Sequence, residues 1–142
     1  MTVRFFGEID GTAEFADLKE RLGPRLVFHL GEVRRVDGRG TLAWVRFVRD
    51  LEGHALAWTH CSPAIVGRLN VVSDFAGGAE LRSILAPYAC AACGRAEEHL
   101  LDVRTQLAGK PLGYAPAFPC DACGQPLELD DLPERYFSFL HP

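Results

Sequence analysis

No run of about 18 apolar residues, the length that a membrane-spanning helix needs, occurs in the 142 residues of this chain. The first twenty residues, MTVRFFGEIDGTAEFADLKE, contain acidic side chains throughout and lack the apolar core of a signal peptide. Internal repeats and low-complexity segments are absent as well. Because 48% of the residues are hydrophobic, the chain can bury a core, and we expect a globular, cytoplasmic protein with no membrane partner.

The sequence also lacks the glycine-rich motifs that bind phosphates. A P-loop requires G-x-x-x-x-G-K-[ST] and a dinucleotide loop requires G-x-G-x-x-G, whereas residues 36–40, VDGRG, contain only G-x-G. These residues connect an apolar segment to an amphipathic one. Free amides at the start of the following helix, beside Arg35 and Arg39, could attract an anion. The simpler interpretation is a glycine turn with solvated arginines.

Lysine is scarce, with 2 lysines against 13 arginines, and the acidic residues are unevenly distributed. Residues 1–89 contain 11 basic and 11 acidic side chains, whereas residues 90–142 contain 4 basic and 8 acidic ones. This shift in charge predicts two domains with these bounds. An acidic second domain would repel a nucleic-acid backbone, so we expect no nucleic-acid partner, although nucleic-acid binding by this domain stays an alternative.

Hydrophobic periodicity in residues 1–89 predicts alternating strands and helices. The predicted strands cover residues 2–9, 25–33, 54–59 and 80–88. The predicted helices are a short one capped by Thr12, a second at 41–51, and a third at 64–70 capped by Ser62. This order predicts an α/β fold, with a mostly parallel sheet and covering helices.

Three short motifs stand before the predicted helices. They are GEID (7–10), VDGRG (36–40), and CSPAIVGRLN (61–70) with its Ser-Pro helix start. Together with the element order, they resemble the STAS domain, the fold of bacterial anti-sigma factor antagonists, over about residues 3–88. The resemblance implies a STAS-like sheet and a non-enzymatic signalling function in a bacterial regulatory or assembly complex. In these antagonists a protein partner contacts the loop before the second helix, which here contains Asp37, Gly38, Arg39 and Gly40.

The regulatory motif of the family is altered in this chain. The family has Asp-Ser-(Ser/Thr)-Gly, and a partner kinase phosphorylates the serine after the aspartate; here the motif is Asp37-Gly38-Arg39-Gly40. Gly38 has no hydroxyl, so phosphorylation is chemically impossible at this position. Thr41 could accept a phosphate instead, although threonine at a helix start is usually a cap.

Arginine is concentrated around the same loop. Five of the 15 basic residues fall within 16 positions: Arg34, Arg35, Arg39, Arg46 and Arg49. If these side chains form a docking surface, the partner should be acidic there, and Arg39 and Arg46 are the best candidates for contact. The alternative is that the arginines only keep a helix face soluble.

Two cysteine pairs give the strongest chemical signal. CAACG (90–94) and CDACG (120–124) are C-x2-C motifs, each followed by a glycine that permits a left-handed turn. In a reducing compartment such pairs indicate a metal site before they indicate disulfides. Each C-x2-C turn, called a knuckle below, offers two sulfurs, and two knuckles make a tetrahedral four-sulfur site. We therefore predict a zinc ribbon with strands at 96–103 and 113–119. The predicted zinc ligands are Cys90, Cys93, Cys120 and Cys123.

Other uses of the cysteines stay open at this point. A thioredoxin-like redox pair would need only one C-x2-C, and a rubredoxin-like iron electron carrier has the same paired knuckles. A catalytic zinc is disfavoured because four thiolates leave no open position, so we expect no enzyme activity. His99 and His141 are expected to be surface residues, and the fifth cysteine, Cys61, a small buried residue rather than a reactive thiol.

The C-terminal segment DLPERYFSFL concentrates aromatic side chains after Pro133. A small ribbon has little core of its own, so this tail is expected to pack on the ribbon or on the first domain. A binding motif for a partner is the alternative.

Overall fold

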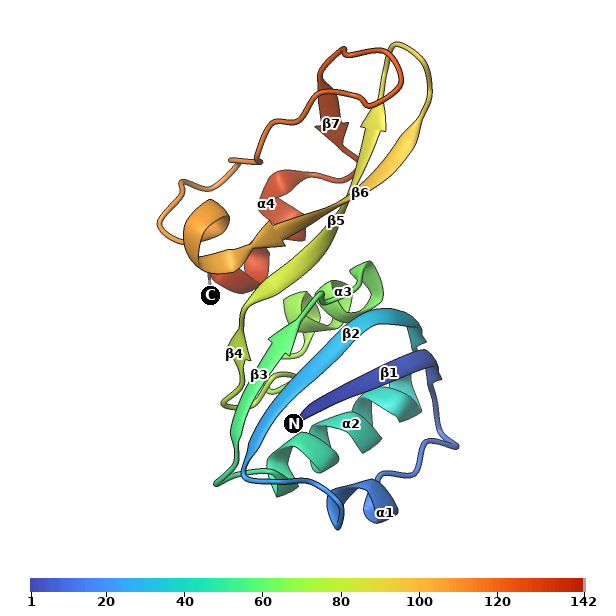
Figure 1. Ribbon diagram of the computed structural model, residues 1–142, viewed down its shortest axis with the longest axis vertical. Coiled ribbons are helices and arrows are strands. Elements are labelled where there is room, and N and C mark those ends of the chain that lie inside the picture. Colours follow the sequence, from blue (N-terminus) through green and yellow to red (C-terminus); the bar gives the residue numbers. More distant parts are fainter. Residues whose placement is uncertain (142) are drawn as a thin grey trace.

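The computed structural model describes residues 1–141 and contains two lobes, each built around one β-sheet (Figure 1). The first lobe (residues 1–82) has a parallel sheet of four strands in sequence order: β1 (Thr2–Ile9), β2 (Arg25–Val36), β3 (Ala55–Thr59) and β4 (Glu80–Leu81). The second lobe (residues 83–141) has an antiparallel sheet in the order β6 (Ala96–Asp102), β5 (Ser83–Cys90), β7 (Leu127–Leu129). The predicted fold class is therefore confirmed.

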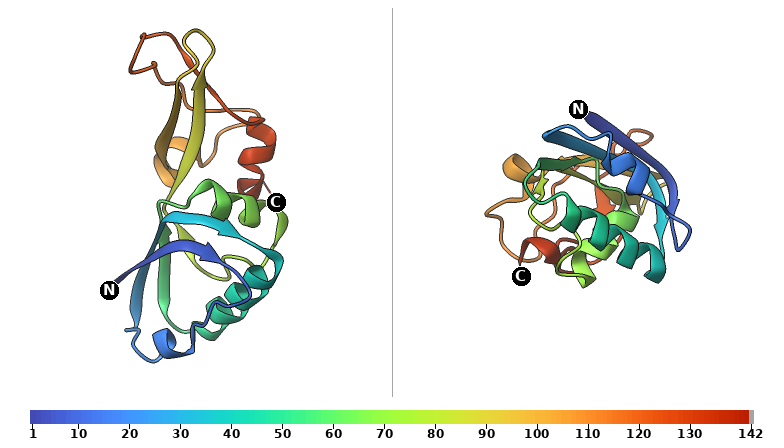
Figure 2. Two further views of the ribbon diagram at one scale, coloured as in Figure 1. Left: turned by 90° about the vertical axis from the view of Figure 1, so that its right-hand side faces the viewer. Right: turned by 90° about the horizontal axis from the view of Figure 1, so that it is seen from below.

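Helices cover the parallel sheet and the junction of the two lobes (Figures 1 and 2). The first lobe contains α1 (Ala16–Lys19), α2 (Gly38–Asp50) and α3 (Pro63–Val71). The second contains a π-helical turn, η1 (Val103–Leu107), then α4 (Pro133–Tyr136) and a 3-10 turn, η2 (Ser138–Leu140). None of the helices within residues 1–141 has the length and apolar character needed to cross a membrane.

An aromatic cluster forms the core between α2 and the parallel sheet. Trp44 of α2 and Trp58 of β3 are fully buried, with ring centroids 5.6 Å apart. Five phenylalanines complete the cluster: Phe5, Phe15, Phe28, Phe47 and Phe75. Such aromatic pairs contribute about 0.5–1.5 kcal/mol each beyond the burial of their area. All of these aromatic contacts lie within the first lobe, and none of them involves Cys90, Cys93, Cys120 or Cys123.

The VDGRG segment is a capped helix start. Strand β2 continues to Val36, and the Asp37 carboxylate accepts a 2.7 Å hydrogen bond from the Gly40 amide, so α2 begins at Gly38 and not at residue 41. Thr41 is therefore not the cap; its buried hydroxyl donates a 2.7 Å bond to the Asp37 carbonyl. A methyl group at Gly40 would overlap the carbonyl of Ile9, which explains the glycine at this position.

Of the other two predicted helix caps, Ser62 is confirmed and Thr12 is wrong. Ser62 caps α3 as predicted, with its hydroxyl accepting from the Ile65 amide at 3.4 Å. Helix α1 has only four residues and no side-chain cap. Thr12 does not cap it, because the hydroxyl and amide of Thr12 both donate to the Asp10 carboxylate, at 2.6 and 2.9 Å. This local turn keeps Thr12 outside the helix.

Two strand predictions near the lobe junction are wrong. The predicted strand 80–88 is divided at Arg82 between β4 and β5, which belong to different sheets. The predicted strand 113–119 is absent from the described chain, and β7 takes its place beside β5. Pro116 and Pro119 lack the amides that a paired strand needs. The division into domains 1–89 and 90–142 stays a prediction, but the two sheets separate at Arg82.

The lobes are joined by hydrogen bonds as well as by the chain. After β3, the Cys61 amide donates to the Ser83 carbonyl at 3.0 Å, and the Leu85 amide donates to the Cys61 carbonyl at 2.8 Å. The hydroxyls of Thr59 and Ser83 lie 2.8 Å apart. This short parallel bridge extends the edge of the first sheet into β5, so the second lobe is fixed to the first at its base.

Candidate metal centre

The four predicted metal ligands come together at the far end of the second lobe. Their Sγ atoms all lie within 4.8 Å of one another. The Sγ atoms of Cys90 and Cys123 are 3.5 Å apart, and those of Cys93 and Cys120 are 3.7 Å apart. A tetrahedral zinc with Zn–S bonds of about 2.3 Å separates its sulfurs by about 3.8 Å. The cluster therefore has the size needed to hold one metal ion.

The two knuckles have the same backbone geometry. Gly94 and Gly124 adopt φ angles of 76° and 75°, in the left-handed region that favours glycine. Each glycine amide donates a 2.8 Å hydrogen bond to the carbonyl of the first cysteine of its pair, Cys90 or Cys120. The role predicted for the two glycines is confirmed. Both turns are thus preformed, and each presents its two sulfurs on one side.

The four clustered thiols differ in exposure, and each affects the pKa of its neighbours. Cys90 and Cys120 are buried, whereas Cys93 and Cys123 are exposed. Donation from the Cys93 backbone amide contributes most to lowering the pKa of Cys90, to about 7. The Gln125 amide lowers the pKa of Cys123, but the surrounding thiols outweigh it and raise that pKa to about 12. Four thiolates this close repel one another unless a cation lies between them.

One buried carboxylate connects the two knuckles, and sequence analysis missed it. The Glu97 side chain, 7% exposed, accepts hydrogen bonds from the Asp121 amide at 3.0 Å and from Arg95 Nε at 3.1 Å. Its other oxygen lies 3.0 Å from Nε2 of His99, whose ring stacks on Phe118 with centroids 4.1 Å apart. The Asp121 amide contributes most to lowering the pKa of Glu97. Because side chains alternate between the two faces of a strand, the position of Glu97 in the predicted strand could have indicated that it faces inward.

The remaining histidines and the fifth cysteine lie away from the cluster. His141 is exposed, as predicted, but His99 is not a plain surface residue, because its ring is held between Glu97 and Phe118. Cys61 is fully buried, and burial raises its pKa to about 12. The prediction of a small buried residue is confirmed for Cys61.

The predicted partner-binding residues differ in how exposed they are and in whether the helix already uses them. Asp37 is occupied as the helix cap, and Gly40 is buried against Ile9. Gly38, Arg39 and Arg46 are exposed. A Cβ atom at Gly38 would meet no atom within 4 Å, so packing does not require glycine there. Only the last three residues can meet a partner without a change in the helix start.

Four of the five clustered arginines border different hollows. Arg34 lines a cleft between the lobes together with Glu98 of β6, and Arg35 lines a small cavity with Asp10 and Asp37. Arg46 faces the hollow beside α1, and Arg49 lies beside a different cavity. Their spacing in the sequence predicted a common surface, but β2 and α2 point these side chains in different directions.

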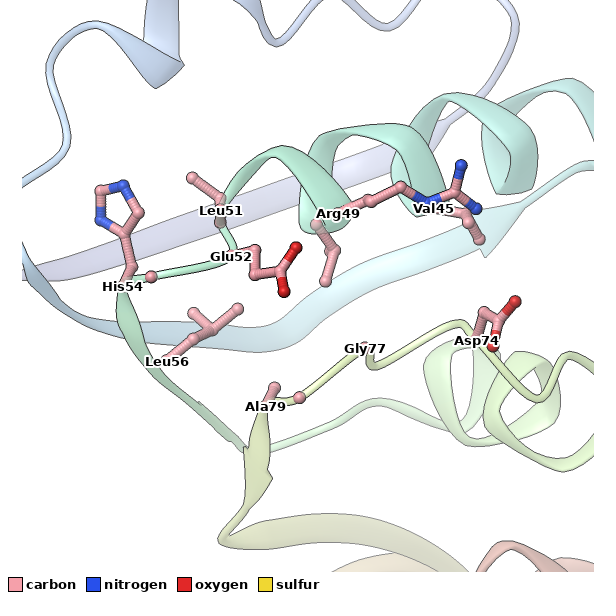
Figure 3. Close-up of a pocket in the computed structure, with 12 residues that line it drawn as sticks. Val45, Arg49, Leu51, Glu52, His54, Leu56, Asp74, Gly77 and Ala79 are labelled. Carbon is pink, nitrogen blue, oxygen red and sulfur yellow. The ribbon is translucent and has the colours of Figure 1, made fainter.

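The cavity beside Arg49 has a volume of about 400 Å³ and lies between the end of α2 and the loop before β4 (Figure 3). Val45 of α2 and Leu56 of β3 are among the apolar residues that line it, and Asp74 lines it from the loop before β4. His54 also borders it, but its Nδ1 lies 2.7 Å from the Gly23 carbonyl and is occupied by that contact. The cavity thus has a mixed lining, with Arg49, Glu52 and Asp74 beside the apolar residues.

Comparison with known proteins gave no match: no family model, curated protein or solved structure is similar enough to this chain to be reported. The evidence for a metal site therefore comes from the cysteine geometry itself, and the STAS resemblance rests on the sequence motifs.

Proposed function

We propose that this protein is a non-enzymatic protein–protein interaction module whose second lobe is held together by one structural zinc ion. The observation that carries the proposal is the convergence of four cysteine sulfurs within 4.8 Å. When all four ligands are thiolates, no coordination position is left for water or substrate, which is typical of structural and not catalytic zinc.

The contacts between the two knuckles favour a metal over a redox disulfide. The Cys90 and Cys123 sulfurs are 3.5 Å apart and those of Cys93 and Cys120 are 3.7 Å apart, so all four sulfurs gather in one cluster and no single C-x2-C pair stands alone. A dithiol redox site of the thioredoxin type would form its disulfide within one C-x2-C pair. A rubredoxin-like iron would use the same four ligands, and metal analysis distinguishes it from zinc.

The proposed partner surface runs along α2 from its first residues, Gly38 and Arg39, to Arg46 about two turns further on, and all three residues are exposed. The STAS resemblance supports this location, and the two arginines favour a partner with carboxylates at the contact. Because Gly38 has no hydroxyl and the Thr41 hydroxyl is buried in a hydrogen bond to Asp37, binding here is not controlled by the family's serine phosphorylation.

The test combines metal analysis with binding. Freshly purified, untagged protein should contain one zinc per chain and be colourless; a red, iron-containing protein would support the electron-carrier alternative. Partners captured from native cells are then purified, and their association rates measured. Charge reversal of Arg39 and Arg46 to Glu should slow association and weaken its salt dependence.

The matched control is the reversal of Arg104 and Lys110, which are also exposed but lie in the second lobe, away from α2. This control changes the net charge by the same amount. Equal association rates for wild type and the Arg39/Arg46 variant at low salt would place the partner surface elsewhere.

A further inference from the structure

The two knuckles are far apart in the sequence, and their relative position must be set by something other than the chain between them. The first knuckle follows directly from β5, since Cys90 is the last residue of that strand. The second joins the sheet through the pairing of Leu127 with Cys90. Its two arms are linked to each other, because the Cys120 amide donates to the Gln125 carbonyl at 2.7 Å and the Leu127 amide donates to the Phe118 carbonyl at 2.9 Å. These bonds hold the base of the second turn, but none of them involves the Asp121 amide inside it.

Glu97 makes a direct connection to the inside of the second turn. Its carboxylate accepts the Asp121 amide, which is the first amide inside the Cys120–Cys123 turn, at 3.0 Å. The same oxygen accepts Arg95 Nε, from the segment that leaves the first knuckle, at 3.1 Å. One oxygen atom thus joins the two turns. With the side chain only 7% exposed, water is a poor substitute for these donors.

A second path leads from Glu97 to the same knuckle. Its other carboxylate oxygen lies 3.0 Å from His99 Nε2. The His99 ring stacks on Phe118, two residues before Cys120, at 4.1 Å and 14°. The Tyr88 ring meets both of these rings edge-on, at 5.3 and 5.2 Å. The second knuckle is therefore held both inside its turn and at its entry.

We propose that Glu97 is a positioning residue for the metal site: it holds the Cys120–Cys123 turn in the orientation that brings its sulfurs to Cys90 and Cys93. The proposal rests on the proposed metal-binding function. Glu97 is not a ligand, and its own contribution is to keep the four sulfurs converged before the ion arrives and while it is bound. Outer-sphere partners of this kind typically change metal affinity by about 10–100-fold when removed.

The neighbouring Glu98 provides a matched control. It has the same charge and lies on the same strand, but its side chain is exposed and points to the other face of β6. Within residues 1–141 the structure gives its carboxylate no hydrogen bond to a knuckle. A general effect of negative charge near the site would appear in both variants, whereas positioning would appear only at Glu97.

The experiment compares full-length wild type with Glu97→Ala, Glu97→Gln and Glu98→Gln. Zinc affinity is measured by competition with a chromogenic chelator, zinc release by stopped flow with excess chelator, and ligand geometry by the absorption spectrum of the cobalt-substituted protein. Glu97→Ala should bind zinc about 10–100-fold more weakly and release it faster. Glu97→Gln should lose less, because its amide oxygen can still accept the Asp121 amide. Glu98→Gln should match wild type.

The cobalt spectrum separates positioning from a general loss of stability. A changed d–d band pattern in Glu97→Gln, with wild-type circular dichroism, supports positioning. If Glu97→Ala does not fold, the Glu97→Gln result decides. Zinc affinity, release rate and cobalt spectrum all unchanged in Glu97→Ala, or changed as much in Glu98→Gln as in the Glu97 variants, would overturn the proposal. Absence of zinc binding by wild type would instead refute the proposed function, so the two failures are distinct.

Discussion

The hydroxyl of Tyr136, near the C-terminus, donates a 2.6 Å hydrogen bond to the carbonyl of Leu85, 51 residues earlier in β5. The backbone carbonyl of Tyr136 accepts a 3.0 Å hydrogen bond from the side chain of Asn70 in α3. The oxygen of the same Asn70 side chain accepts a 2.9 Å hydrogen bond from the Phe139 amide. The aromatic tail therefore lies between the two lobes, in contact with both (Figure 2). The prediction that this tail packs on the protein is confirmed.

Removing this hydroxyl should loosen the junction without disturbing its packing. Tyr136→Phe keeps the buried ring but leaves the Leu85 carbonyl without its donor, so we expect a loss of about 1–2 kcal/mol in the free energy of unfolding. Urea denaturation of the zinc-loaded protein measures it. Tyr114→Phe is the control, because that ring is 36% exposed, and its effect should stay within about 0.5 kcal/mol. Equal effects of the two substitutions would show that the hydrogen bond from Tyr136 to Leu85 does not stabilise the junction of the lobes.

Two glycines in VDGRG should respond in opposite ways to the same added methyl group. Gly40→Ala forces a methyl into the Ile9 carbonyl, and we expect it to cost about 3 kcal/mol or more, or to prevent folding. Gly38→Ala meets no neighbouring atom and removes a glycine from a helix, so it should stabilise by about 0.5–1 kcal/mol. Thermal and urea unfolding test the pair. A tolerated Gly40→Ala would show that α2 does not approach β1 as described.

Cys61 should be unreactive as long as the protein is folded. Burial raises its pKa to about 12, so its thiol stays protonated at pH 8 and very little thiolate is available to attack a disulfide reagent. Counting thiols at pH 8 should give none reacting fast in the zinc-loaded protein. After chelation four thiols should react fast and Cys61 more slowly, because it becomes accessible only when β5 separates from the first lobe. Cys61→Ala should leave the chelator-released count at four; a fall to three would place Cys61 among the accessible thiols.

Loss of one ligand should affect more of the chain than the ribbon alone. Structural zinc contributes about 10–16 kcal/mol in small metal-dependent folds. Cys120→Ser should therefore unfold the second lobe and, because the tail is held by Asn70, also loosen α3. The aromatic cluster around Trp44 should keep the parallel sheet folded. Hydrogen exchange measured by mass spectrometry should show fast exchange in β5, β6 and α3 but slow exchange in β2. Cys61→Ala, which removes a thiol outside the cluster, should retain slow exchange in β6.

Much of the fold follows from local patterns in the sequence. The alternating or apolar segments that became β1, β3 and β6 were recognisable, and Ser62-Pro63 located the start of α3. The duplicated C-x2-C-Gly motif located the metal site because thiolate coordination requires that arrangement of residues. These signals lie within a few residues of one another, so no tertiary information was needed to find them.

The features that were missed depend on contacts between distant segments. Gly38 and Gly40 looked like a turn because glycine is a poor helix former, but Asp37 caps a helix there and Ile9 requires the glycine. Residues 80–88, ELRSILAPY, contain no glycine turn that would mark the change of sheet at Arg82. Glu97 became important only through the Asp121 amide, 24 residues away.

X-ray absorption spectroscopy at the zinc edge, on freshly purified full-length protein, tests the central claim most directly. The account predicts one zinc per chain with four sulfur neighbours at about 2.3 Å and no nitrogen or oxygen ligand. Cys120→Ser should lose this signal, whereas Cys61→Ala should retain it. A first shell containing oxygen or nitrogen, iron in place of zinc, or an unchanged four-sulfur spectrum in Cys120→Ser would contradict a structural zinc bound by Cys90, Cys93, Cys120 and Cys123.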